Sequence, residues 1–392
     1  MRPHGDPLRI CVVGDLEGLH THRWVRCFVE WGHQVHGVSF YQPRRPPPGV
    51  AVHALVPGRA SGDERRKSQL GEWPTGVSPS MWRLANAARY WRRGLGRVIR
   101  EIAPDVLHAH FAVEHGFYAA LAGYHPYVVT AWGSDILVEA ARSPLARAIA
   151  RFALRRVDLA TSNNAYMADR IRALGVPADR IAVITLAVDR AFLEAATASV
   201  NLSPDDATPP TVVSLRSLDS PLYSVDVVLR AMARVRGRRP QVRLLVAGEG
   251  RLRTRLERLA EGLALGEGVR FLGLLGREDL LDTLAGAHVY VSVPRSDATA
   301  VSTLEAMGVG CFPILSDLPS QRELVEDGVN GLRVPVGDES SLAEAILGAL
   351  DDADLRRRAA EANRRFVRER MVQEDQMAEM ERWYYRLAGR DG

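Results

Sequence analysis

Two acids frame a short run of small side chains in the second half of the chain. Asp297 and Glu305 lie eight positions apart in the segment SDATAVSTLEAMGVG, residues 296–310. The preceding run HVYVSVP is typical of a β-strand, so we expect Asp297 on the loop that follows it and Glu305 in the first turns of a helix. Amides at the start of a helix attract anions, and a diphosphate is a frequent occupant. Carboxylates accept hydrogen bonds from vicinal hydroxyls, so the stretch suits a ligand whose phosphates lie between two hydroxyl-bearing groups.

A structural explanation of the same stretch stays open. Ser302 and Glu305 form the pattern S-x-x-E, a capping box that could serve only to start a helix. Asp297 could make no more than a local turn bond. Taken by itself, the stretch supports the ligand site and the helix cap equally.

Short apolar runs alternate with amphipathic segments along the whole chain. LRICVVGD, PDVLHAHF and YVVTAW belong to one series, and TVVSLRS and QVRLLVAGEG open a second. This alternation predicts an α/β fold with two doubly wound, Rossmann-like domains, whose ligands bind outside the carboxyl ends of the strands, in a cleft between the domains. The expected parts are a first domain at 1–195, a linker at 196–210, a second domain at 211–370 and a C-terminal helix at 371–392 that packs back on the first domain.

Composition excludes several classes of protein. The net charge of +4 over 392 residues is far from the strongly basic profile of a nucleic-acid binder. Lysine occurs once, at Lys67, so phosphate contacts must come from arginine or backbone amides. No run approaches the roughly 18 apolar residues of a membrane-spanning helix, and the apolar start is too short for a secretory signal. Cys11, Cys27 and Cys311 lack metal spacing and are expected to be buried thiols of a cytoplasmic protein.

The residues that follow the acid pair carry a family resemblance. LEAMGVGCFPILSDLPSQRELVEDGVNGLRVPVGD resembles the donor-binding half of the family 4 glycosyltransferases of GT-B architecture, and the acid-x7-acid frame is that family's signature. Further motifs of the family are matched at 305–307, 310–317, 323–331 and 334–338. The resemblance covers residues 211–350. It implies a retaining hexosyltransferase that takes a nucleotide-diphosphate sugar as co-substrate, needs no cofactor and no metal, and works in polysaccharide or glycolipid assembly on a sugar or lipid-linked acceptor.

The same resemblance gives roles to the residues of the frame. Asp297 would contact hydroxyls of the transferred sugar, although the family usually has glutamate at this position. Glu305 would bind the ribose. The amides of Ala298, Thr299 and Ala300 would hold the diphosphate.

Three further positions complete the expected donor site. Gly248 would line the nucleotide pocket. Arg216 matches an arginine that neutralises the diphosphate in the family, and Tyr223 stands near the place of the lysine that usually follows, where it would donate a hydrogen bond. The structural alternatives are a surface arginine at 216 and a packing aromatic at 223.

In the first domain, candidate residues follow the predicted strands. His110 in HAHF and Asp135 in TAWGSD resemble the family's first domain, where T-x-H-G-x-D is frequent. Trp132 replaces the histidine of that motif, so Asp135 is the better polar candidate for the catalytic side. Gly14, at the end of the first strand, permits a tight turn near the acceptor or the diphosphate, and a purely structural turn fits it equally well.

Other functions remain as alternatives. His108 and His110 share one face of a strand, with His115 nearby, and an H-x-H pair suits a zinc hydrolase. Histidines bonded within a strand are the plainer interpretation. A nucleotide-sugar epimerase would share the two-domain architecture, and a non-catalytic sugar-nucleotide-binding protein would share the site but never turn the donor over.

One basic segment suggests a membrane contact. ARYWRRGLGRVIR, residues 88–100, mixes apolar side chains with arginines. A basic amphipathic helix can lie on an anionic membrane, which would suit a lipid-linked acceptor and a peripheral place at the inner face of the membrane. A helix that only covers the core with a charged outer face is the more common case.

Overall fold

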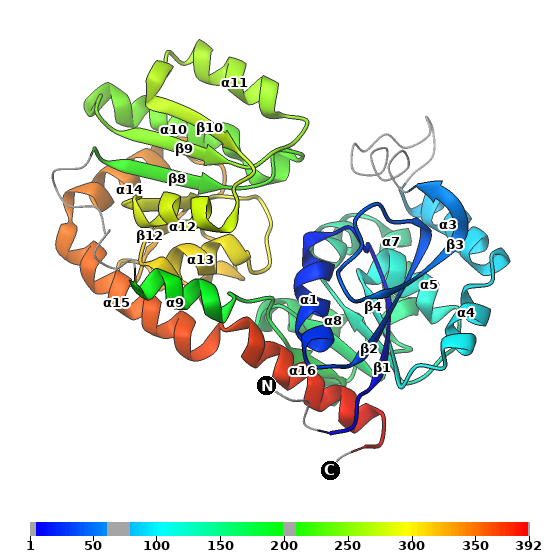
Figure 1. The fold of residues 1–392 in the computed structure, drawn as a ribbon. Helices are drawn as coiled ribbons and strands as arrows, with labels where there is room; N and C mark the ends of the chain where they lie inside the picture. The colour runs from blue at the N-terminus through cyan, green and yellow to red at the C-terminus, as the bar shows by residue number, and fades with distance from the viewer. Residues whose placement is uncertain (1–4, 61–78, 199–208, 391–392) are drawn as a thin grey trace. The chain divides into compact units, whose positions relative to one another are not determined.

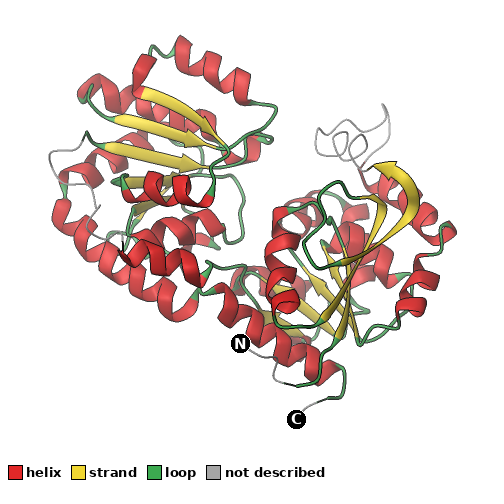
Figure 2. Cartoon of the chain, in the orientation of Figure 1, coloured by secondary structure: helices red, strands yellow, loops and turns green. Residues whose placement is uncertain are grey.

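The computed structural model describes residues 5–60, 79–198 and 209–390 (Figure 1). The chain divides into two compact units, Met1–Leu186 with Glu374–Gly392, and Ala187–Gln373. Each unit is a parallel sheet with helices packed against it (Figure 2). Among the described residues, the helices are all too short or too polar to cross a bilayer.

The sheet of the first unit has seven strands. They are β1 (Arg9–Val13), β2 (Gln34–Gln42), β3 (Ala51–Ala60), β4 (Val106–His110), β5 (Tyr127–Thr130), β6 (Leu159–Ser162) and β7 (Ile181–Val183). Their spatial order is β3-β2-β1-β4-β5-β6-β7, and the chain reverses direction across the sheet between β1 and β4. All five residues of β4 are buried, as expected for a parallel strand covered on both faces.

Helices and short turns connect these strands. They are α1 (Leu19–Glu30), α3 (Pro79–Arg92), α4 (Leu95–Ile102), η1 (Ala112–Gly116), α5 (Phe117–Ala120), η2 (Ser134–Glu139), α6 (Ala140–Arg142), α7 (Pro144–Leu154), α8 (Ala165–Ala173), η3 (Ala178–Arg180) and, from the end of the chain, α16 (Gln373–Leu387). Local capping explains two of the starts. Ser143 accepts from the amide of Ala146 before α7, and Asn164 accepts from that of Met167 before α8.

The sheet of the second unit has six strands. They are β8 (Thr211–Leu215), β9 (Arg243–Ala247), β10 (Val269–Gly273), β11 (Val289–Ser292), β12 (Phe312–Ser316) and β13 (Leu332–Val334). Their order is β10-β9-β8-β11-β12-β13, so the reversal here falls between β8 and β11. In open α/β sheets such a reversal opens a crevice at the carboxyl ends of the two strands, where ligands bind.

The helices of the second unit follow the same alternation. They are α9 (Arg190–Ala198), η5 (Pro221–Tyr223), α10 (Val225–Arg238), α11 (Arg253–Gly262), η6 (Gly266–Gly268), α12 (Arg277–Ala285), α13 (Val301–Val309), η7 (Gln321–Glu323), α14 (Glu339–Asp351) and α15 (Ala353–Arg370). The two-domain α/β fold expected from the alternation of apolar runs is confirmed.

The first unit ends earlier than the sequence suggested. We expected its boundary at 195, but the division falls after Leu186, because α9 packs in the core of the second unit through Phe192 and Leu193. The expected linker at 196–210 therefore begins inside α9. Its residues 199–208 lie outside the described part of the chain.

The C-terminal helix α16 packs on the first unit, as expected. The Tyr384 hydroxyl lies 2.5 Å from Nδ1 of His108, and Trp24 donates to the same hydroxyl over 3.4 Å. His33 and Glu381 form a second buried contact, 2.7 Å between Nε2 and the carboxylate. The helix is therefore held by specific polar bonds inside the core as well as by apolar packing.

The basic segment 88–100 is not one continuous helix. Gly94 has φ +83° and separates α3 from α4. Tyr90, Leu95 and Ile99, three apolar residues of this range, are buried in the first unit. These three residues therefore belong to the core, as in the more common case of a helix that covers the core, whereas Trp91 is exposed. The contact of this range with a membrane stays a prediction.

The bond between α16 and β4 makes a stability prediction. Tyr384→Phe removes the hydroxyl and leaves the buried Nδ1 of His108 without its partner, which should lower the free energy of unfolding by about 1–3 kcal/mol. Urea denaturation of the variant measures the loss. Tyr385→Phe is the matched control, because the Tyr385 hydroxyl donates to the carbonyl of Asp6 in a less buried place and its loss should cost less. Equal effects of the two substitutions would contradict this account.

Candidate active site

The helix α13 starts directly beyond the strand reversal of the second unit. It begins at Val301, and its N-cap is Ala300, whose side chain has no acceptor. Ser302 is therefore inside the helix, and the capping box considered from the sequence is not formed. A helix start without a side-chain cap keeps its first-turn amides for another acceptor. Ala298 and Thr299, just before it, are almost fully buried.

Arg216 and Asp297 meet at the carboxyl ends of β8 and β11. The Arg216 guanidinium forms an ion pair with Asp297 through Nη2, and both side chains are largely buried. Nε of Arg216 also donates to the hydroxyl of Ser292 over 2.8 Å. Burial is the largest single influence on the pKa of Arg216 and lowers it, but Asp297, Tyr290 and Tyr223 together raise this pKa above its ordinary value. The two residues that the sequence placed on the diphosphate and on the sugar are thus neighbours.

Tyr223 lies beside this pair. The ring centroid of Tyr223 is 5.5 Å from the guanidinium carbon of Arg216, within the range of a cation–π contact. Burial, and after it the charge of Asp297, raises the pKa of the phenol, so Tyr223 keeps its proton at neutral pH and can donate a hydrogen bond. It is the last residue of η5, a short turn that starts after Ser220, whose hydroxyl accepts from the amide of Leu222.

Gly248 lets two strand-end loops come together. Its φ is +141°, and a Cβ at this position would lie 2.0 Å from the carbonyl oxygen of Arg216. The amide of Arg216 donates to the carbonyl of Ala247 over 3.0 Å. Gly248 therefore positions the backbone of Arg216, because no other residue fits this approach.

Glu305 occupies the second turn of α13. Its side chain is buried, and all residues of the helix from Thr303 to Val309 are buried as well. A carboxylate is expensive to bury, and a position one turn from the helix start keeps it near the same edge of the sheet as Asp297. Both acids of the frame thus lie on the segment that leads from β11 into α13.

Two serines were missed by the sequence analysis. Ser292, the last residue of β11, accepts from Arg216, and Ser320 donates to the backbone carbonyl of Asp297 over 2.8 Å. Ser292 carries the signal that marked the other candidates, a polar residue at a strand end. Ser320 belongs to a loop beyond β12, and no local pattern identifies it.

In the first unit, a buried chain of hydrogen bonds runs through His108. Its Nδ1 bonds Tyr384, and its Nε2 lies 2.7 Å from the Thr130 hydroxyl, which is 2.6 Å from that of Thr161. Burial lowers the pKa of His108 to about 3. Both ring nitrogens are engaged by hydroxyls, which leaves none for a metal. Within the described ranges there is no group of three or more metal-ligating side chains.

His110 lies two residues further along β4, next to Gly14. Its Nδ1 is 3.2 Å from the Thr21 hydroxyl, and burial, followed by repulsion from His108, holds its pKa well below the usual value. A Cβ at position 14 would be only 3.3 Å from the Cβ of His110. Gly14 therefore makes room for the imidazole at the carboxyl edge of β1 and β4.

The side chain of Asp135 is bonded to backbone amides within the first unit. Its carboxylate is fully buried and accepts from the backbone amides of Ala112, Gly133, Ile136 and Trp132 over 2.8–3.2 Å. Burial raises its pKa, although the four amides favour the ionised form. A carboxylate satisfied in this way holds the loops after β4 and β5 together and does not present an oxygen to a substrate.

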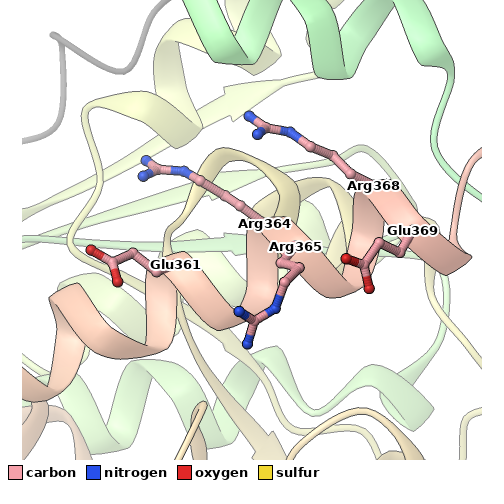
Figure 3. Close-up of a pocket in the computed structure, with 5 residues that line it drawn as sticks. All are labelled: Glu361, Arg364, Arg365, Arg368 and Glu369. Carbon is pink, nitrogen blue, oxygen red and sulfur yellow. The ribbon is translucent and has the colours of Figure 1, made fainter.

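A hollow of about 420 Å³ lies away from these residues, on α15 (Figure 3). Arg364, Arg365 and Arg368 line it together with Glu361 and Glu369. Arg364 also donates to the carbonyl of Val309 at the end of α13. Burial, followed by repulsion from Arg368, lowers the pKa of Arg364. The hollow contains none of the predicted donor-site residues.

Comparison with known proteins identifies the family. Residues 9–164 match the family model described as "Glycosyl transferase 4-like", and residues 203–366 match "Glycosyl transferases group 1". Together the two matches cover most of the chain, which belongs to the family 4 glycosyltransferases of GT-B architecture. The resemblance stated from the motifs is confirmed.

The relatives of this chain include mannosyltransferases named for lipid substrates. It is 32% identical over 150 residues to a phosphatidyl-myo-inositol mannosyltransferase of Mycolicibacterium smegmatis, over 37% of each chain. It is 30% identical over 169 residues to a GDP-mannose-dependent monoacylated alpha-(1-6)-phosphatidylinositol monomannoside mannosyltransferase of Corynebacterium glutamicum, over 41% of this chain and 43% of the relative. The alignments thus span about two fifths of these relatives' length.

Solved structures show the same fold. Anabaena HepE in complex with UDP superposes with a TM-score of 0.71 at 17% identity, over 97% of this chain and 100% of that one. Sucrose-phosphate synthase from Thermosynechococcus elongatus gives a TM-score of 0.72 at 18% identity, over 98% and 100%. At this identity the superpositions establish the GT-B fold alone.

The buried histidines predict how stability depends on pH. His108 has a folded-state pKa of about 3 against about 6.5 when unfolded, so the unfolded chain binds more protons between these values. Its contribution is fully present above about pH 6.5 and is lost as the pH falls toward 3. In His108→Gln, the free energy of unfolding measured by urea titration between about pH 6 and pH 4 should fall less steeply than in wild type, by about 1.4 kcal/mol per pH unit. Parallel curves for the two proteins would contradict the assignment.

Proposed function

We propose that this protein transfers a hexose from a nucleotide-diphosphate sugar to an acceptor hydroxyl, with retention of configuration at the anomeric carbon. The observation that carries the proposal is the Arg216–Asp297 pair beside the uncapped start of α13, at the strand reversal of the second unit. A cation that follows β8 thus lies beside a carboxylate and the helix amides that follow β11, at one edge of the sheet. The GDP-mannose dependence of one relative and the UDP complex of one structural neighbour support a nucleotide-diphosphate donor.

Each group has a separate task in the transfer. Arg216 and the first amides of α13 would bind the diphosphate, Asp297 the hydroxyls of the sugar and Glu305 the ribose. The bond between the anomeric carbon and the phosphate oxygen breaks, and its electron pair leaves with the nucleoside diphosphate. Guanidinium and amide donors stabilise that negative charge, and stabilisation of this kind commonly supplies most of an enzyme's rate enhancement. The acceptor hydroxyl attacks the same face of the sugar, and its proton passes to the leaving phosphate oxygen.

The hydrogen bonds that Arg216 already makes leave part of its guanidinium for a phosphate. The bonds of Arg216 to Ser292 and Asp297 use Nε and Nη2. A guanidinium carries five N–H groups, so Nη1 can reach a phosphate oxygen while the arginine stays anchored. The lysine that the family often places nearby is replaced by Tyr223, whose protonated phenol would supply a neutral donor in its stead.

We further propose that the first unit contacts a membrane that carries the acceptor. Met81, Leu84 and Trp91 are 58%, 41% and 64% exposed on α3. Their spacing places them on one face of the helix, and the exposed Arg89 and Arg93 follow in the same region. Trp91 belongs to the basic segment 88–100, and Met81 and Leu84 lie before it. The phosphatidylinositol substrates in the names of the relatives favour a lipid-linked acceptor.

The donor site is tested by removing its charges. Arg216→Ala and Glu305→Ala should each lower kcat/KM about a hundredfold, the scale of losing one transition-state or donor contact. The assay measures release of nucleoside diphosphate and formation of glycoside with UDP-, GDP- and ADP-sugars. Arg322→Ala is the matched control, because Arg322 pairs with Asp317 on the surface of the same unit. Wild-type rates in both site variants would reject the assignment of Arg216 and Glu305. Conversion of the donor without any glycoside would indicate a nucleotide-sugar epimerase. Binding of the donor without turnover would indicate a non-catalytic sugar-nucleotide-binding protein.

The membrane contact is tested with vesicles. Wild-type protein should sediment with phosphatidylglycerol vesicles, and Met81→Ser with Trp91→Ser should weaken this binding at least about tenfold, because two side chains lose apolar burial. Val329→Ser is the control, since Val329 is 52% exposed on the second unit. Unchanged vesicle binding by the double variant would show that α3 does not contact the membrane.

A further inference from the structure

His20 and Trp132 form a ring stack at the carboxyl edge of the first sheet. Their ring centroids are 5.1 Å apart with an interplanar angle of 23°. His20 lies in the first turn of α1, which follows β1, and Trp132 lies just after β5. Trp24 and His110 contact Trp132 edge-on at 5.6 and 5.3 Å. Two strand-end segments thus present the stack, and buried rings fix its position.

His20 is the imidazole of this cluster that a substrate can reach. His108 and His110 are buried, and burial keeps the pKa of both well below the ordinary value, so they are neutral at physiological pH. The Nε2 of His110 is itself buried. His20 is exposed, whereas Trp132 is half-buried. We therefore expect His20, and not His110, to contact a ligand directly.

The chemistry of the stack suits a hydroxylated ring. An indole packs against the apolar C–H face of a sugar, and an imidazole nitrogen forms hydrogen bonds with hydroxyls. We propose that His20 hydrogen-bonds a hydroxyl of the pyranose or cyclitol ring that the first unit binds, with Trp132 as the rigid surface behind it. This assignment rests on the proposed transferase function and adds a substrate-contacting residue to it.

The test separates nitrogen chemistry from ring packing. His20→Ala removes the ring, whereas His20→Phe keeps an aromatic ring on Trp132 but has no nitrogen. Transfer is measured with UDP-glucose, GDP-mannose and ADP-glucose as donors and phosphatidyl-myo-inositol vesicles as acceptor. Both variants should lose about tenfold in kcat/KM, the cost of one substrate hydrogen bond. His125→Phe is the matched control, because His125 pairs with Asp158 before β5, at the opposite edge of the sheet, and should keep the wild-type rate.

A second measurement locates the ring that His20 contacts. Slow hydrolysis of the donor without acceptor should fall together with transfer if His20 binds the donor sugar, and stay unchanged if it binds the acceptor ring. A His20→Phe variant with wild-type rates, or an equal loss in the His125 control, would overturn the assignment. A wild-type protein that neither transfers nor hydrolyses any of the three donors would reject the proposed function and this inference with it.

Discussion

A buried arginine charge organises the second unit. Arg216 is taken out of water at the end of β8, and such a charge is tolerated only where an opposite charge and further acceptors meet it. Ser292 at the end of β11 accepts a hydrogen bond from Arg216, and Asp297 in the loop beyond β11 forms an ion pair with it. Ser320 donates to the backbone carbonyl of Asp297 from a third segment. A buried ion pair adds little to stability once desolvation is counted, so its placement at a strand reversal favours a functional role over a structural one.

The two ends of α13 differ in their hydrogen-bond partners. Its N-cap, Ala300, has no side-chain acceptor, and its end is held by the Arg364 guanidinium, which donates to the carbonyl of Val309. A cation at this end complements the helix dipole, whose positive end faces the proposed phosphates. Gly310, with φ +98°, makes the contact possible, because a Cβ there would lie 2.5 Å from Arg364. Of the arginines that line the hollow in Figure 3, Arg364 therefore caps the carboxyl end of α13.

Much of the second unit could be predicted from the chain alone. The acid frame and the start of α13 follow from residues at a predicted strand end, since parallel strands bring their carboxyl ends to one edge. Arg216 was predicted from the family resemblance. The pairing of Arg216 with Asp297 could not be predicted, because it depends on which strands are neighbours. Ser320 was missed for the same reason.

The first unit shows where local patterns fail. Asp135 follows a strand as the catalytic candidates do, yet four amides of the folded loops satisfy its carboxylate. Residues 88–100 have the composition of an amphipathic helix, but the turn at Gly94 and the burial of Tyr90 and Ile99 depend on tertiary packing. The division after Leu186 was hidden because α9 carries the small residues of a linker while its Phe192 and Leu193 enter the core.

The central claim is that a diphosphate binds between Arg216 and the first turn of α13. A crystal structure of the protein with UDP or GDP tests it most directly. The account predicts the β-phosphate within hydrogen-bonding distance of the Arg216 guanidinium and of an amide at Val301 or Ser302. Phosphates bound elsewhere, for instance among the arginines of α15, with Arg216 and Asp297 left as they are, would contradict it.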